Sequence, residues 1–420
     1  MTTENRPTKL EEKVEQLRRQ GVEVPAPHTL EIGDEVDLSA VRGPETVLHS
    51  GTKLYGDLSI APGCRIGYEE PATVEGCAVG PGCRLAGGYF SGAVFLDEVV
   101  VGKGAHIRGG TLMEEQSNGA HTVGLKQTVL LPFVTLGSLI NFCDVLMAGG
   151  TSRRDHSEVG SSFIHFNFTP FGRNGDKATP TLVGDVPRGV MLRSPRIFLG
   201  GQAGLVGPMH IDYGTVLAAG FVYRRDHGPD ELVVGEKLVS RAMPFTPLRY
   251  GRIRNKVLRN LTYTGNLVAL WHWYERVRGR LCVDEEHRAL YRRAQGNLVS
   301  GIEERIKRLG QVAGYMEDSV GELSADATPN EREIAAQREF GERWPEMEAR
   351  LRAFRSMEQE QLYNEVEPGL SRAGGATYVE QIGSMDEETV GAGTRWLAAI
   401  VDEVEQVWPK KIPPGLQPRG

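Results

Sequence analysis

Aliphatic residues recur with a period of six along the first half of the chain, separated by glycine, proline and aspartate. Gly or Ala usually follows the aliphatic residue, as where Ile60 precedes Ala61. A six-residue period with one inward aliphatic side chain is typical of the hexapeptide repeat of a parallel β-helix. Stacked turns of this kind bury a continuous core that no single turn could bury. The period is carried by Ile32 and Leu38, Ile60 and Ile66, Val79 and Leu85, Val101 and Ile107, and Leu205, Ile211 and Leu217.

An all-β sandwich with glycine-rich turns is the alternative, but sandwich strands recur at about 8 to 12 residues. The glycine content also favours the β-helix, because 35 of the 52 glycines fall within residues 1–250. Glycine fits the tight corners of a triangular prism. Two polar segments, 149–155 and 169–180, interrupt the repeat. Loops that leave a regular solenoid are where binding chemistry is commonly found.

Helical periodicity flanks the repeat on both sides. Residues 9–20 place Leu10, Val14 and Leu17 on one helix face. After residue 245 the pattern becomes helical over roughly 252–280, 284–312, 330–364 and 376–408. We therefore divide the chain into an N-terminal helix and linker (1–28), a β-helix domain (29–245) and an α-helical domain (246–420).

The first part of the helical domain is basic, with 11 Lys or Arg against 4 Asp or Glu from Arg249 to Arg293. A solvated helix face, or one that docks on the acidic remainder, is one interpretation, and an anion-binding or nucleic-acid patch is the other.

Composition narrows the classes of protein. The chain has 420 residues and a net charge of −7, which argues against a nucleic-acid partner. No run of about 18 apolar residues is present and the N-terminus is polar, so we expect a cytoplasmic protein without a membrane partner. No metal site is expected, since none of the five cysteines forms a metal-clip spacing. We interpret them as reduced and mostly buried: Cys64, Cys77, Cys83, Cys143 and Cys282.

Residues 13–228 resemble the acetyltransferase half of the bifunctional UDP-N-acetylglucosamine pyrophosphorylase / glucosamine-1-phosphate N-acetyltransferase family. The resemblance rests on a helix that ends near Gly21 and on motifs that follow in order: GAH at 119–121, VGLK at 123–126, VGSSFIHFNF at 159–168, TLVGD at 181–185 and FLGGQAGLVGP at 198–208. It implies a left-handed β-helix, a homotrimer with active sites between subunits, and acetyl-CoA as the acyl donor. Only about 28 residues precede the first turn, so we expect the uridylyltransferase domain of that family to be missing.

The resemblance also implies site residues. Acetyl transfer to an amine needs a base and groups that hold the substrate. The family's base aligns with Phe142, which cannot accept a proton, so His156 and His165 are the candidate catalytic bases. Substrate binding is assigned to Lys126, Asn141, Asn167 and Lys177, and contact with the acyl donor to Gly201, Ala219 and Arg225.

Each of these residues also has a structural interpretation. His156 could be a loop residue and His165 a hydrogen-bonded wall residue. Asn167 could cap a turn, Lys177 could be solvated surface, and Arg225 could cap the end of the solenoid.

Three functions are therefore open. The first is an acyl-CoA-dependent transferase, acting on an amino sugar phosphate or a nucleotide amino sugar. The second is a non-catalytic binding or assembly protein derived from that family, which the substitution at Phe142 favours. The third is a metal hydratase of the γ-carbonic anhydrase type, which requires three histidines around one zinc ion.

Overall fold

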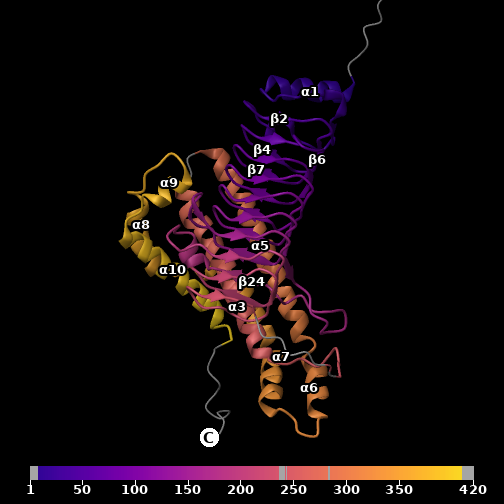
Figure 1. The fold of residues 1–420 in the computed structure, drawn as a ribbon. Helices are drawn as coiled ribbons and strands as arrows, with labels where there is room; N and C mark the ends of the chain where they lie inside the picture. Colours follow the sequence, from indigo (N-terminus) through magenta and orange to yellow (C-terminus); the bar gives the residue numbers. More distant parts are fainter. Residues whose placement is uncertain (1–7, 236–241, 243, 282–283, 409–420) are drawn as a thin grey trace, which may run out of the picture.

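A three-faced parallel β-solenoid and a set of helices packed along it make up the computed structural model, which describes residues 8–235, 242, 244–281 and 284–408. In all but the first and last turns the chain contributes one strand to each of the three faces, and the turns stack into one column (Figure 1). All strands on the three faces pair in parallel with the turns above and below. The handedness is left-handed, and the helical region follows the last turn. The fold class predicted from the six-residue period is confirmed.

The three faces are defined by their strands. Face 1 consists of β1 (Glu31–Ile32), β3 (Lys53–Tyr55), β6 (Ala72–Glu75), β9 (Gly88–Ser91), β12 (Ala105–Ile107), β15 (Gly124–Lys126), β18 (Asn141–Cys143), β23 (Ile164–Phe166), β26 (Gly204–Val206) and β29 (Val222–Tyr223). Face 2 consists of β4 (Ser59–Ile60), β7 (Ala78–Val79), β10 (Val94–Phe95), β13 (Leu112–Met113), β16 (Val129–Leu130), β19 (Val145–Met147), β24 (Thr181–Val183) and β27 (Met209–Ile211). Face 3 consists of β2 (Val47–Leu48), β5 (Arg65–Ile66), β8 (Arg84–Leu85), β11 (Val100–Val101), β14 (Asn118–Gly119), β17 (Thr135–Leu136), β22 (Glu158–Val159), β25 (Phe198–Leu199), β28 (Val216–Leu217) and β30 (Leu232–Val233).

Strands are short because each side of the prism holds only one or two inward side chains. Ile60 and Ile66, the equivalent residues of two successive hexads, occupy adjacent faces and are both fully buried. Phe142 is likewise an inward residue, packed edge-on against Phe163 of the next turn. The two interruptions of the repeat leave the prism at its corners, as an antiparallel hairpin of β20 (Gly150–Ser152) and β21 (Asp155–His156) and as a longer loop over 167–180.

Helices cap and line the solenoid. The N-terminal α1 starts at a capping box between Thr8 and Glu11 and buries Val14 and Leu17. The helices are α1 (Lys9–Arg19), α2 (Val186–Gly189), α3 (Ile253–Trp273), α4 (Gly279–Leu281), α5 (Glu285–Ala313), α6 (Met316–Ser324), α7 (Glu331–Arg352), α8 (Glu360–Leu370), α9 (Tyr378–Gly383) and α10 (Glu387–Glu405). Shorter helical turns are η1 (Pro27–Thr29), η2 (Leu38–Ala40), the π-turn η3 (Tyr274–Arg278) and η4 (Phe354–Ser356).

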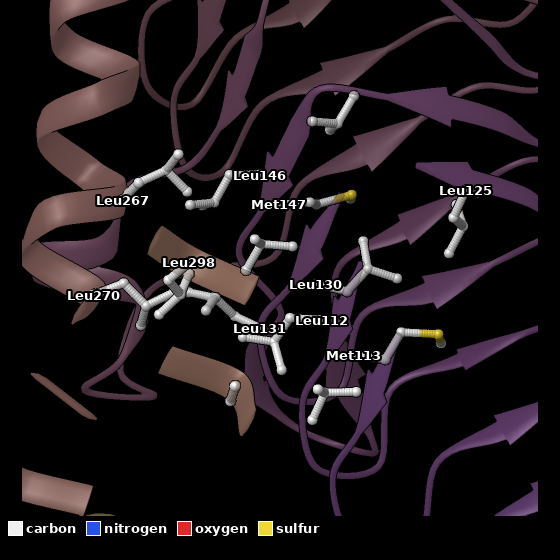
Figure 2. Close-up of a cluster of buried hydrophobic side chains, with 14 of the residues drawn as sticks. Leu112, Met113, Leu125, Leu130, Leu131, Leu146, Met147, Leu267, Leu270 and Leu298 are labelled. Atoms are coloured by element: carbon white, nitrogen blue, oxygen red, sulfur yellow. The ribbon is translucent and has the colours of Figure 1, made fainter. Parts of the chain in front are cut away.

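Face 2 is the side on which α3 and α5 pack. Figure 2 shows Leu267 of α3 beside Leu146 of face 2, and Leu298 of α5 beside Leu131. α5 runs along the stack of turns: Asn297 donates to the carbonyl oxygens of Gly92 and Thr111, and farther along α5 Arg305 reaches Asp144.

The basic segment that begins at Arg249 pairs with carboxylates rather than forming an open patch. Its contacts to the solenoid favour the docking interpretation: Arg293 to Asp57 at 2.5 Å, Arg278 to Glu114 at 2.8 Å, Lys256 to Asp176 at 2.5 Å, and Arg259 to Asp226 at 2.8 Å.

Cys64, Cys77 and Cys83 are buried and free, and Cys143 is half-buried and free. Cys282 lies outside the described residues. Among the helices of the described part of the chain, none is long and apolar enough to cross a bilayer.

Candidate functional site

Three positive side chains converge around Cys143 on face 1. Lys126 of β15 pairs in register with Cys143 of β18, and Arg108 follows β12 on the turn before. The Arg108 guanidinium lies 3.9 Å from the Cys143 sulfur. Burial and the Asp144 carboxylate raise the pKa of the Cys143 thiol, whereas the positive charges of Arg108, Lys126 and Lys177 partly lower it. All three cations therefore lie near enough to Cys143 to act on its charge.

The loop over 167–180 brings Asn167 and Lys177 to this cluster. The Asn167 amide donates to Asp144 at 3.2 Å, and the loop closes on itself through paired hydrogen bonds between Thr169 and Asp176. Arg305 of α5 donates to Asp144 at 2.7 Å and reaches the Lys177 carbonyl at 3.4 Å. The helical region thus holds the loop from behind while Lys177 remains exposed.

This basic cluster, Arg108, Lys126 and Lys177, has the chemistry of an anion site. Lysine and arginine are the usual phosphate ligands of proteins. Within the part of the chain that the structure describes, the buried Nε of Arg108 has no hydrogen-bond partner. A buried N–H without an acceptor destabilises the folded protein unless a ligand or a water molecule accepts its hydrogen bond. Asn141 lies on the same outer surface, paired with Gly124 of the preceding turn.

His156 lies elsewhere, on the β20–β21 hairpin at the corner between faces 2 and 3. Its Nδ1 is 3.0 Å from the Arg153 carbonyl oxygen, which only accepts, so Nδ1 carries the proton. The Nε2 lone pair is therefore the basic one. His156 lines a pocket of about 580 Å³ that also holds Asp155, Glu158 and Arg196.

His165 points into the prism. Its Nδ1 donates to the Cys143 carbonyl at 2.5 Å, and its Nε2 accepts from the Thr181 hydroxyl at 2.8 Å. Burial lowers its pKa to about 4, so the ring stays neutral near pH 7. Both ring nitrogens therefore make hydrogen bonds within the solenoid, which is the structural role considered for His165.

Gly201 and Ala219 lie on a column of small residues at the corner between faces 3 and 1. A Cβ built on Gly160 would lie 2.4 Å from the Gly201 nitrogen, and one on Gly200 would lie 2.3 Å from the Ala219 nitrogen. The adjacent turns therefore approach closely at Gly160 and Gly200, where any larger side chain would clash with the backbone. Arg225 is exposed just beyond β29.

The structure thus groups Lys126, Asn167 and Lys177, with Asn141 on the same face. It places His156 and the small-residue column at two other corners. Sequence reasoning missed Arg108 and Asp144. Arg108 could have been found from the repeat, because it lies one turn before Lys126. Asp144 could not, because its contact is with Arg305, 161 residues away in the sequence.

In the described ranges, no three His, Cys, Asp or Glu side chains are grouped as metal ligands. The three-histidine arrangement that a zinc hydratase needs is therefore not formed by these residues.

These features define a left-handed parallel β-solenoid protein with helices along one face and a cationic cluster on another. No protein-family model matches the chain. Curated relatives that it matches include bifunctional GlmU proteins. That of Pelobacter propionicus is 27% identical over 192 residues, covering 46% of this chain and 37% of the relative. Those of Thermotoga sp. strain RQ2 and Mycobacterium tuberculosis are each 26% identical, over 54% and 50% of this chain and 45% and 40% of the relatives.

The chain therefore spans less than half the length of these relatives. The resemblance predicted from the hexapeptide motifs is confirmed as homology to GlmU proteins, carried by about half of this chain.

Proposed function

We propose that the chain is an acyl-CoA-dependent transferase that acts on an amino sugar phosphate or a nucleotide amino sugar. The observation that carries the proposal is the basic cluster. Lys126 and Lys177, chosen from the sequence as substrate ligands, lie near Cys143 together with Arg108, and Asn167 stands beside them. Three cations near one another suit a phosphate group, and the nearby Asp144 carboxylate is buried and bonded to Arg305.

The chemistry requires a base near the acceptor amine. The amine nitrogen attacks the thioester carbonyl of acetyl-CoA, a C–N bond forms, and the C–S bond breaks to release the coenzyme thiol. In this proposal His156 Nε2 takes the proton that leaves the amine, because its tautomer is fixed by Arg153. His165 is left with a structural role, since both of its ring nitrogens are already bonded inside the prism.

The acyl donor has a suitable surface in the small-residue column at Gly201 and Ala219. In this proposal the extended arm of the donor lies along this corner, and Arg225, exposed just beyond β29, meets a phosphate. Acetyl-CoA would supply the activated acyl group there, and the chain's own residues would supply orientation and the base.

His156 and the basic cluster lie on different faces of one protomer, so in this proposal a second copy completes the site. Helices pack on face 2, and large apolar side chains remain exposed on the other two faces. Phe166 of face 1 is 43% exposed and Leu232 of face 3 is 70% exposed. Burying such side chains between copies stabilises an assembly. A homotrimer, as the family resemblance implies, would bring face 3 of one copy to face 1 of the next.

The test is subunit complementation. Wild-type protein is assayed for thiol release from acetyl-CoA with glucosamine 1-phosphate and with UDP-glucosamine as acceptors. His156→Ala and Lys126→Ala are each expected to lose activity, the histidine variant by about 10²–10⁴-fold. Mixing and reassembling the two variants should restore part of the activity, because some sites then contain both wild-type residues. His28→Ala, at an exposed histidine of η1, is the matched control.

A monomer in light scattering, or no recovery in the mixture of otherwise assembled variants, would refute the shared site. Absence of thiol release with either acceptor, together with binding of the sugar phosphate, would instead identify a binding or assembly protein.

A further inference from the structure

The column of outward positions on face 1 has no side chain at two glycines, Gly124 and Gly204. A Cβ on Gly204 would lie 2.8 Å from the Phe166 ring, so of the two Gly124 is the open position. Tyr89, His106, Gly124 and Asn141 are register partners on four successive strands, from β9 to β18. The Tyr89 and His106 rings lie against each other with centroids 5.3 Å apart, and the Tyr89 hydroxyl donates to Glu75 at 2.6 Å. At Gly124 the column has no side chain.

The gap at Gly124 is not required by the backbone. A Cβ at this position would meet only ordinary contacts, the nearest being Asn141 Oδ1 and the Ile140 carbonyl oxygen, both at 3.7 Å. The φ angle of Gly124 is also not in the left-handed region. Other residues could therefore occupy this strand position without strain, so the glycine leaves open a space that the fold itself does not need.

The dimensions of this space suit a planar ring. Neighbouring strands are about 4.8 Å apart, so the backbones of His106 and Asn141 lie about 9.6 Å apart on either side of Gly124. The Asn141 Oδ1 atom leans toward the gap, 3.7 Å from a Cβ built on Gly124. A ring between them would have its centroid about 4.8 Å from the His106 ring, within the range of about 4.5–7 Å for aromatic pairs. It would extend the Tyr89–His106 pair by one member and place the Asn141 amide against its other side.

The basic cluster adjoins this slot along the same strands. Arg108 is two residues beyond His106, and Lys126 is two residues beyond Gly124. In a β-strand such residues point to the same side, about 6.6 Å apart. The spacing between the slot and the two cations therefore matches the spacing between a planar ring and the phosphates of a single ligand.

We propose that the acceptor of this protein is a nucleoside-diphosphate-linked amino sugar whose nucleobase stacks on His106 above Gly124. The inference rests on the proposed function. Of the two substrate classes proposed there, it selects the nucleotide amino sugar, which carries a nucleobase. The diphosphate lies on Arg108 and Lys126, and the sugar extends toward Asn167 and Lys177.

The experiment compares ligands with and without a base by calorimetry: UDP, inorganic pyrophosphate and adenosine 3′,5′-bisphosphate. UDP is expected to bind the wild-type protein about tenfold or more tightly than pyrophosphate, because base stacking contributes on that scale. Gly124→Leu fills the slot and should reduce the affinity for UDP to that for pyrophosphate, leaving pyrophosphate binding unchanged. Thr73→Leu, on the same column beyond Tyr89, is the matched control and should bind UDP like the wild type.

Equal affinity for UDP and pyrophosphate, or unchanged UDP binding by a folded Gly124→Leu variant, overturns the inference. Adenosine 3′,5′-bisphosphate binding more tightly than UDP, and lost in Gly124→Leu, also overturns it, because the slot then belongs to the coenzyme. These outcomes are separable from failure of the proposed function, which is judged by thiol release from acetyl-CoA.

Discussion

Arg278 joins the helical region to the solenoid through a buried ion cluster, and its removal is expected to loosen the whole helical region. Its guanidinium is 0% exposed and donates to Glu115 Oε1 at 2.5 Å, to Glu115 Oε2 at 2.9 Å and to Glu114 Oε2 at 2.8 Å. The Tyr274 hydroxyl donates to Glu114 at 2.7 Å, and the guanidinium lies 3.6 Å from the Tyr378 ring centroid.

Arg278→Ala would leave two buried carboxylates without a cation. Breaking a buried ion pair from one side costs about 3–5 kcal/mol. We expect a loss of this size in the free energy of unfolding of the helical region. Replacing the whole group by neutral residues, as in Arg278→Met with Glu114→Gln and Glu115→Gln, should recover most of the loss, because no charge then remains buried.

Tryptophan fluorescence during urea unfolding is the assay, because all five tryptophans lie after residue 270 and report on the helices. Arg288→Ala is the control: the Arg288 side chain is 51% exposed and pairs with the 69%-exposed Glu285. Its effect should stay within about 0.5 kcal/mol. A loss below about 1 kcal/mol for Arg278→Ala would refute the reasoning, since the cluster would then contribute no more than an exposed pair.

Three further predictions concern charge. Burial raises the pKa of Glu114 to about 7, above its unfolded value, so the stability of the helical region should fall as the pH rises from about 4.5 to 7; urea titrations of wild type and Glu114→Gln should show this slope only in the wild type. Hydrogen bonds to Asp97 and Asp284 raise the pKa of His287 to about 9, so the stability it contributes should be present below about pH 6.5 and lost toward pH 9, and His287→Ala should remove that dependence. Lys126→Ala should weaken binding of inorganic pyrophosphate by about tenfold in calorimetry, and an unchanged affinity would remove Lys126 from the anion site.

The sequence predicted the solenoid because its physical constraint is local. One aliphatic residue every six positions, followed by Gly or Ala, is sufficient to define one side of a turn, and Ile60 and Ile66 occupy the inward positions that the period requires. The helical stretches were also predictable from their periodicity. The expected helix over 330–364 is divided, however, since α7 ends at Arg352 and α8 begins at Glu360.

The site was predictable only in part. Lys126 lies on the regular repeat, so its neighbour Arg108 follows from register alone. The position of Lys177 depends instead on how an irregular loop is held, and no periodicity specifies that. The contacts between helices and solenoid join residues some 160 positions apart, such as Arg278 and Glu114. Charge composition left open whether the basic segment meets acidic groups or forms an anion-binding patch, and it did not specify any partner.

The helical region bears on the site through these same contacts. Arg305 bonds Asp144, which holds Asn167, and also reaches the Lys177 carbonyl. Lys256 of α3 pairs with Asp176, the residue before Lys177. The loop that carries two of the proposed substrate ligands is therefore anchored to α3 and α5 rather than to the solenoid alone. Because α5 is fixed to successive turns from Asp57 to Asp144, a displacement of the helices would move the loop relative to Lys126. The helical region thus acts as the rigid support on which the geometry of the basic cluster depends.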